Sequence, residues 1–127
     1  FRNNFHVFFE RCIFFNKFPV FNDSRNWILF IFPIIYNFTR NSKLIIYKGM
    51  AAATGNYYCG LMEYTDMAFL LHFLREEDLF IDIGANIGSY TILASAEIGA
   101  KTIAVEPIPT TFKALEDNIQ INKLNSK

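Results

Sequence analysis

A glycine-containing turn and a later carboxylate have the residue types and spacing of a nucleoside-binding site. Gly84 and Gly88 are four residues apart, and the small Ala85 and the polar Asn86 lie between them. Because glycine has no Cβ and asparagine tolerates the left-handed conformation, such a turn can bring its backbone close to a bound ligand. Glu106 follows about 20 residues after the glycines, the spacing at which a carboxylate binds a ribose diol. These residues predict a site for a nucleoside-containing ligand.

Asp82 precedes this turn by two residues, and two roles fit its position. Its carboxylate could accept hydrogen bonds from a cationic group of the ligand, or from the turn itself, in which case it only fixes the turn geometry. No residue pattern identifies a catalytic base. His72 is a candidate, but a single histidine on a mostly apolar helix is more often a packed, hydrogen-bonded side chain. The prediction is therefore a binding site whose chemistry stays open.

The elements that must position these residues follow a strand–helix–strand–helix order between residues 79 and 124. Leu79–Ile83 is a short apolar run bounded by turn residues, which is typical of a central parallel strand covered on both faces. A helix is expected over Gly88–Ile98, with Gly99 at its end, and a second buried strand over Thr102–Val105. Pro109 suits the first turn of the last helix. The pattern predicts the first βαβα part of a doubly wound, parallel α/β sheet.

The segment before this unit is expected to add a β-hairpin and one helix. Lys43–Lys48 and Tyr57–Cys59 have strand-like compositions, and the small residues between them indicate a turn, so a hairpin is predicted over 43–59. A helix is predicted over 66–75, with Asp66 as its N-cap. Its apolar face is wide enough for the helix to be covered from more than one side.

Residues 1–42 are predicted to be a poorly defined, phenylalanine-rich extension that packs loosely on the domain. The apolar run over 27–36 has only about half the length that spans a bilayer, and Pro33 would interrupt a helix there. Contact of this extension with a membrane is the less favoured alternative.

Charge and cysteine content indicate neither a nucleic-acid partner nor a metal. The net charge of the chain is zero, and no pattern indicates a nucleic-acid partner. Cys12 and Cys59 lack the spacing of a metal site or a disulfide framework. We therefore expect no metal, and two buried, inert cysteines in a reducing, cytoplasmic environment.

Several separated motifs resemble the start of the FkbM-type methyltransferase family, which belongs to the class I S-adenosylmethionine-dependent enzymes. They agree in order and spacing over roughly the second half to two-thirds of the chain, and comprise the lead-in segments 58–64 and 66–74, Asp82–Gly88, Ala104–Pro107, and the set Phe112, Leu115, Asn118 and Asn122. The resemblance implies a Rossmann-like class I methyltransferase fold. It also implies that the chain is an incomplete, N-terminal fragment, inactive alone, because the family's adenine-contacting strand and acceptor pocket would follow residue 127.

The resemblance assigns a role to each candidate site residue. Glu106 would bind the ribose hydroxyls of S-adenosyl-L-methionine, and Asp82 would support the methionine end. The backbone cradle would be formed by Gly84, Ala85, Asn86 and Gly88. The implied reaction is O-methylation of a hydroxyl group, and the implied partner is a sugar, glycan or other small-molecule acceptor.

Two other interpretations stay open. The cofactor-binding half of an NAD(P)-dependent oxidoreductase has a similar unit, but its turn normally reads Gly-x-Gly-x-x-Gly. Here Asn86 occupies the position of the second glycine, and Gly88 falls one residue short of the third. S-adenosylmethionine has no phosphate and does not need that second glycine, so the methyltransferase interpretation is favoured. The third interpretation is a non-catalytic remnant that keeps the fold without useful affinity.

Overall fold

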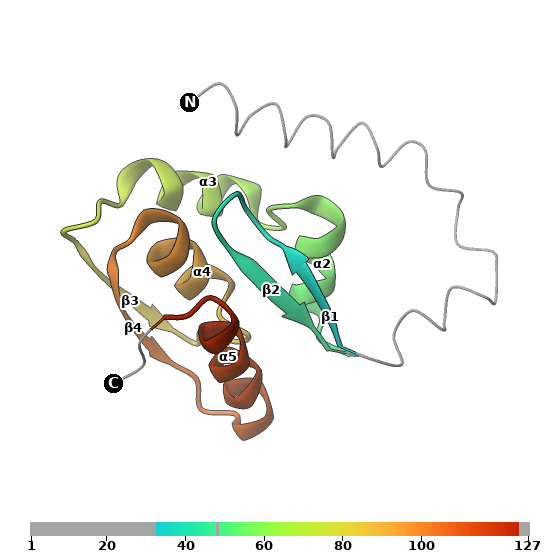
Figure 1. Cartoon of the computed structure of the whole chain (residues 1–127). Helices are drawn as coiled ribbons and strands as arrows, with labels where there is room; N and C mark the ends of the chain where they lie inside the picture. The colour runs from blue at the N-terminus through green and yellow to red at the C-terminus, as the bar shows by residue number, and fades with distance from the viewer. Residues whose placement is uncertain (1–32, 48, 125–127) are drawn as a thin grey trace.

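The computed structural model describes residues 33–47 and 49–124 (Figure 1). Two of its strands form an antiparallel hairpin and two form a parallel pair, so the fold is mixed α/β. In chain order the elements are β1 (Ile34–Asn37), β2 (Lys43–Ile46), α2 (Ala51–Cys59), α3 (Tyr64–Phe73), β3 (Leu79–Ile83), α4 (Ser89–Ile92), η2 (Leu93–Ile98), β4 (Lys101–Val105) and α5 (Pro109–Ile121).

The parallel pair is the strand–helix–strand unit that the sequence predicts. β3 and β4 pair with Leu79 opposite Lys101 and Ile83 opposite Val105. α4 and η2 follow each other directly and form the crossover between these strands, the second part being π-helical. Gly99 ends this crossover helix in the left-handed conformation, with φ 91°, as its position predicts. The carboxyl ends of both strands therefore lie at one edge, next to the turn that precedes α4.

One face of the parallel pair is exposed, contrary to the expectation that the first strand is covered on both faces. Leu79, Ile81 and Ile83 are 57, 55 and 81 % exposed. On the opposite face Phe80 packs against the core and Asp82 is buried. A short apolar run has the same composition whether one or both faces are covered. The described helices cover only one face of this pair.

The antiparallel hairpin is formed by β1 and β2, so the hairpin predicted over 43–59 is wrong. β2 pairs with β1, the strand that precedes it in the chain, with Ile34 opposite Ile46 and Asn37 opposite Lys43. β1 thus lies within the segment that the sequence assigned to a poorly defined extension. Residues 1–32 of that extension lie outside the described residues.

Residues 51–59 form the helix α2 and not a turn followed by a strand. Its three leading alanines are strong helix formers, and Ala53 and Asn56 are buried on its inner side. This tertiary packing overrides the strand propensity of the two tyrosines near its end. Cys59 at its last position is exposed, not buried as expected.

None of the helices in the described part of the chain has the length and apolarity needed to cross a membrane.

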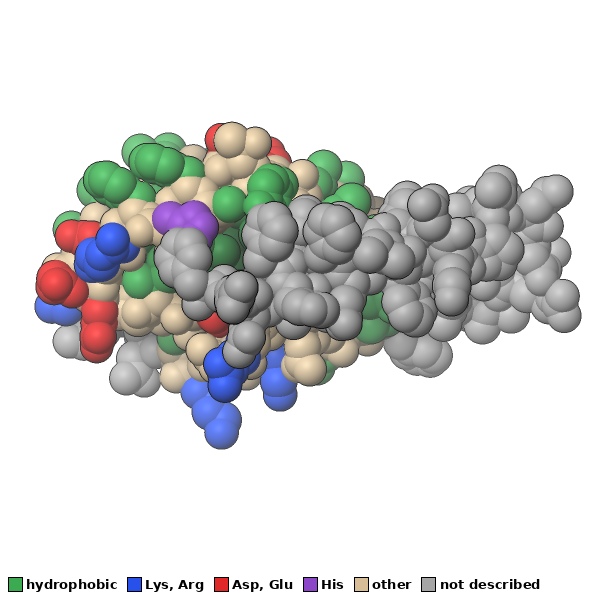
Figure 2. Space-filling model, turned by 90° about the horizontal axis from the view of Figure 1, so that it is seen from above, with side chains coloured by type: hydrophobic (Ala, Val, Ile, Leu, Met, Phe, Trp, Pro, Cys, Tyr) green, Lys and Arg blue, Asp and Glu red, His purple; other side chains and the backbone are tan. Residues whose placement is uncertain are grey.

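α3 begins two residues earlier than predicted and is covered on one side only. Asp66 lies in its first turn, and the N-cap is Glu63, which makes no side-chain capping bond. Met67 and Leu70 are buried, whereas Phe69 and Phe73 are 64 and 67 % exposed and stack on each other. The view onto the α3 side shows several hydrophobic side chains at the surface (Figure 2). The predicted two-sided cover of this helix is therefore wrong for the described residues.

β2 is the centre of the folded part, because its buried residues belong to both hydrophobic clusters. Leu44 packs in the cluster that lies among the hairpin, α3 and the crossover helix. Ile46 packs in the second cluster, with Ala53 of α2, Ala114 of α5 and Ile87 of the glycine turn. The turn is thereby anchored to the core through its one large apolar side chain.

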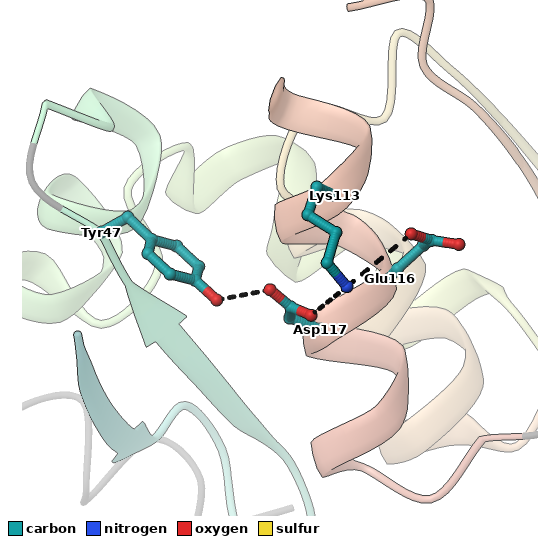
Figure 3. Close-up of polar contacts among 4 residues, drawn as sticks. All are labelled: Tyr47, Lys113, Glu116 and Asp117. Carbon is teal, nitrogen blue, oxygen red and sulfur yellow. Dashed lines mark hydrogen bonds and ion pairs between the residues drawn. The ribbon is translucent and has the colours of Figure 1, made fainter. Parts of the chain in front are cut away.

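Polar contacts join the end of β2 to α5 beside the second cluster (Figure 3). The Tyr47 hydroxyl donates to Asp117 Oδ2 at 2.6 Å, and Lys113 Nζ donates to Asp117 Oδ1 at 2.8 Å. Burial raises the pKa of Tyr47 to about 12, and the bond to Asp117 contributes to this rise. The hydrogen bonds from Lys113 and then Tyr47 lower the pKa of Asp117. These contacts hold the hairpin and α5 together from the outside.

Candidate functional site

The turn between β3 and α4 uses three left-handed residues. Gly84, Asn86 and Gly88 have φ values of 76°, 53° and 90°, as their residue types predict. A Cβ added at Gly88 would lie 2.5 Å from Leu115 Cδ1, so α5 packs directly against this residue. A Cβ added at Gly84 would meet no atom within 4 Å. The turn is therefore closely packed at one end and open at the other.

Every backbone N–H group of this turn donates a hydrogen bond within the chain. Gly84 and Ala85 donate to the Val105 carbonyl at 2.8 and 3.0 Å, and Gly88 donates to the Ala85 carbonyl at 2.8 Å. Asn86 N donates to Glu106 Oε2, and Ile87 N donates to Asn86 Oδ1. The turn itself thus offers no free backbone N–H group to a phosphate.

Glu106 lies against the turn, although it belongs to the end of the neighbouring strand. Its Oε2 accepts the hydrogen bond from Asn86 N at 2.9 Å, and its Oε1 accepts one from Ile108 N at 2.9 Å. A carboxylate has about four acceptor positions, so two remain for hydroxyl groups of a ligand. The structure therefore brings together the two parts of the site that the sequence predicts to converge.

Asp82 is buried beneath the turn and is already hydrogen-bonded. The Thr91 hydroxyl donates to Asp82 Oδ2 at 2.6 Å, and both side chains are buried. This bond joins the end of β3 to the first helical turn of α4, which fits the structural role of a strand-end aspartate. The sequence did not indicate Thr91, because the hydroxyl of a threonine within a helix usually bonds to the backbone of its own helix.

Tyr90 binds one further carboxylate near the start of α4. Its hydroxyl donates to Glu63 Oε2 at 2.7 Å. Burial raises the pKa of the Tyr90 hydroxyl, and the bond to Glu63 and the charges of Asp66 and Asp82 raise it further. Tyr90 therefore stays protonated at neutral pH and acts as a donor, not as a base.

Exposed aliphatic side chains flank Glu106 at the carboxyl ends of the strands. Ile83 and Val105 are paired across the two strands, and Ile108 follows Glu106 by two residues. Ile83 is largely exposed, and Val105 and Ile108 are about half exposed. A carboxylate beside exposed apolar side chains suits a ligand with both hydroxyl groups and a flat apolar base. Ile108 has no distinguishing sequence signal, and its place became evident only from the bond between its N–H group and Glu106.

The remaining candidates do not join this site as catalytic groups. His72 is exposed in the last turn of α3 and is not packed in the core as expected. Among residues 33–47 and 49–124, no group of three histidine, cysteine, aspartate or glutamate side chains is placed to hold a metal ion. The arrangement at the turn can bind and orient a ligand.

Comparison with known proteins gives one partial similarity. The chain is 41% identical over 58 residues to the 31-O-demethyl-FK506 methyltransferase FkbM of Streptomyces tacrolimicus. The matched region covers 43% of this chain and 22% of that protein. No family model and no solved structure matches the chain. The partial similarity points to a methyltransferase relationship.

Proposed function

We propose that this chain carries the cofactor-binding part of an S-adenosylmethionine-dependent methyltransferase. The main support is the contact of Glu106 with the left-handed turn, with Glu106 Oε2 2.9 Å from Asn86 N. In this proposal Glu106 accepts hydrogen bonds from two ribose hydroxyls, and the open space at Gly84 in the same turn takes another part of the cofactor. The partial identity to a 31-O-demethyl-FK506 methyltransferase supports the choice of cofactor. The O-demethyl substrate in that protein's name supports an oxygen atom as the methyl acceptor.

In this proposal the residues present bind the cofactor without rearrangement of the turn. Glu106 would hold the ribose, and Ile83 and Ile108 would offer apolar surface to the adenine. The open side of Gly84 would take the methionine part, since nothing lies within 4 Å of the position that a Cβ would occupy. Asp82 and Glu63 would supply negative charge for the ammonium group. When bound, the cofactor supplies an activated methyl group on a positively charged sulfur.

The occupied N–H groups favour this cofactor over a dinucleotide. A pyrophosphate is normally bound by free backbone N–H groups of the glycine turn and by the helix N-terminus. In this turn all five N–H groups from residue 84 to residue 88 already have acceptors within the chain. A ligand that carries a positive charge and a ribose and lacks a phosphate suits the nearby carboxylates better than a dinucleotide does.

The contribution of these residues to the reaction would be binding and orientation. Holding a donor and an acceptor in line can account for about 7–11 kcal/mol of a reaction barrier. No base is assigned to this part of the protein. We propose a hydroxyl group of a sugar or another small molecule as the methyl acceptor.

Calorimetric titration of the full chain with S-adenosylhomocysteine and with NADH tests this proposal. We expect binding of S-adenosylhomocysteine, and a 10- to 150-fold (about 1.5–3 kcal/mol) weaker affinity for Glu106→Gln, because a charged acceptor is lost. Glu116→Gln is the matched control, since Glu116 lies on the exposed side of α5. Binding of NADH in preference, no binding of either ligand, or equal effects of the two substitutions would contradict the proposal.

A further inference from the structure

The carboxamide of Asn118 lies buried between α5, the edge of β2 and the glycine turn. The residue is 0 % exposed. Its Oδ1 accepts a hydrogen bond from Ile45 N at 2.7 Å, and its Nδ2 donates to the Ile87 carbonyl at 2.8 Å. One side chain therefore joins a strand that lies 73 residues earlier in the chain to a turn that lies 31 residues earlier.

The Ile87 carbonyl is a sensitive point of the turn. Ile87 lies between the two left-handed residues Asn86 and Gly88, and its own side chain is fully buried. The N–H group of the preceding residue, Asn86, is the one that donates to Glu106. A shift of the Ile87 peptide would therefore change the geometry between the turn and the Glu106 carboxylate.

We propose that Asn118 is a positioning residue for the glycine turn and, through the turn, for Glu106. This inference rests on the proposed function, because the quantity it controls is the affinity for the nucleoside cofactor. In this view α5 and the β1–β2 hairpin help to set cofactor affinity, although neither contributes a residue that contacts the cofactor.

Only a side chain with both a donor and an acceptor can make these two contacts. Ile45 N requires an acceptor, and the Ile87 carbonyl requires a donor. Aspartate has nearly the same shape and can still accept from Ile45 N, but in its ionised form it has no hydrogen for the Ile87 carbonyl. Burial favours the protonated form, which could still donate, so the variant is measured at pH 9 as well as at pH 7 and its losses should grow with pH. Asn118→Asp therefore removes one contact and leaves a buried group of similar volume in place.

Asn122 provides a matched control one helical turn further along α5. Its Oδ1 accepts from Lys43 N at 2.8 Å, and its Nδ2 donates to the Lys43 and Asn118 carbonyls at 2.8 and 2.7 Å. It thus joins α5 to the same strand, but none of its hydrogen bonds reaches the turn. A loss that reflects only weaker packing of α5 on the hairpin should occur in both variants.

The experiment compares wild type, Asn118→Asp and Asn122→Asp as full chains, under conditions in which circular dichroism shows each to be folded. We expect Asn118→Asp to bind S-adenosylhomocysteine at least 10-fold more weakly, and Asn122→Asp to stay within about 3-fold of wild type. The amide nitrogen resonance of Gly88 reports on the Ile87 carbonyl without any ligand. It should shift in Asn118→Asp and stay in place in Asn122→Asp.

The two readouts separate this inference from the proposed function. Failure of wild type to bind S-adenosylhomocysteine contradicts the proposed function, whereas an unchanged Gly88 resonance in Asn118→Asp overturns the positioning role by itself. Equal losses of affinity in both variants would also overturn it. If Asn118→Asp does not fold, Asn118→Ala and Asn122→Ala are compared by the same two measurements, because alanine removes the contact with the Ile87 carbonyl and is a good helix former.

Discussion

At the scale of single residues, the two glycines of the turn have different reasons for being glycine. Both are left-handed, which disfavours any residue with a Cβ by about 1–2 kcal/mol. Gly88 is also in contact with Leu115, whereas Gly84 faces open space. Gly88 is thus required by packing of the protein, and Gly84 by conformation and by access to its open side.

Alanine substitution should separate these two reasons. We expect Gly88→Ala to lower the free energy of unfolding by about 2–4 kcal/mol, because strain of the backbone adds to overpacking against Leu115. Gly84→Ala should lower it by only about 1–2 kcal/mol, while weakening binding of S-adenosylhomocysteine. Urea denaturation and calorimetric titration of both variants measure the two effects. A larger stability loss at Gly84 than at Gly88 would contradict this assignment.

At this scale the sequence predicted the site residues whose signals are local. The positive φ values of Gly84, Asn86 and Gly88 follow from residue type. The contacts of Asn118 could not be predicted, because an asparagine in a helix gives no indication of which distant carbonyl it will bind. Its partners became adjacent only when the hairpin and the turn packed against α5.

At the scale of elements, two sets of side-chain hydrogen bonds join β2 to α5. Asn118 and Asn122 bond to the β2 backbone, and Tyr47 bonds to Asp117 (Figure 3). The folded-state pKa of Tyr47 is raised from 10.0 to about 12. Its protonated form is therefore stabilised by folding, and this contribution is fully present below pH 10 and is lost as the pH rises towards 12.

The substitution Tyr47→Phe tests this contribution. We expect it to lower the free energy of unfolding at pH 7 by about 1 kcal/mol, since one hydrogen bond to a carboxylate is lost. Between pH 10 and 12 the difference between wild type and variant should disappear. Chemical denaturation at several pH values measures it, with Tyr57→Phe as a control because Tyr57 is exposed. A constant difference across that range would contradict the role of Tyr47.

The elements from β3 to α5 could be predicted, and the first half of the described chain could not. Glycine, asparagine and proline mark the ends of β3, the crossover helix and α5, so the boundaries there are encoded locally. The hairpin depends on which segment pairs with β2, and a strand-like composition fits both β1 and residues 57–59. Packing of Ala53 against the second cluster decides in favour of a helix over 51–59.

At the scale of the whole molecule, the structure has one covered and one exposed face of its parallel pair. Five aliphatic residues of β3 and β4 lie on the exposed face: Leu79, Ile81, Ile83, Ile103 and Val105. A contiguous apolar surface of this kind is uncommon on a monomeric protein. The covered face, in contrast, contacts the helices through residues such as Phe80, which packs against the cluster that contains Ile92.

The exposure of one face of the β3–β4 pair can be tested by comparing the stability of two variants. Each variant replaces an isoleucine on one side of the pair. Ile92 is 0 % exposed and Ile81 is 55 % exposed. Ile92→Ala should lower the free energy of unfolding of the full chain by about 2–5 kcal/mol, because it removes buried methyl groups and leaves a cavity. Ile81→Ala should lower it by no more than about 1 kcal/mol, the range of strand propensity alone. Urea denaturation of both variants measures the difference. A loss at Ile81 as large as that at Ile92 would mean that this face is covered in the folded chain, because only burial gives an isoleucine side chain so large an effect.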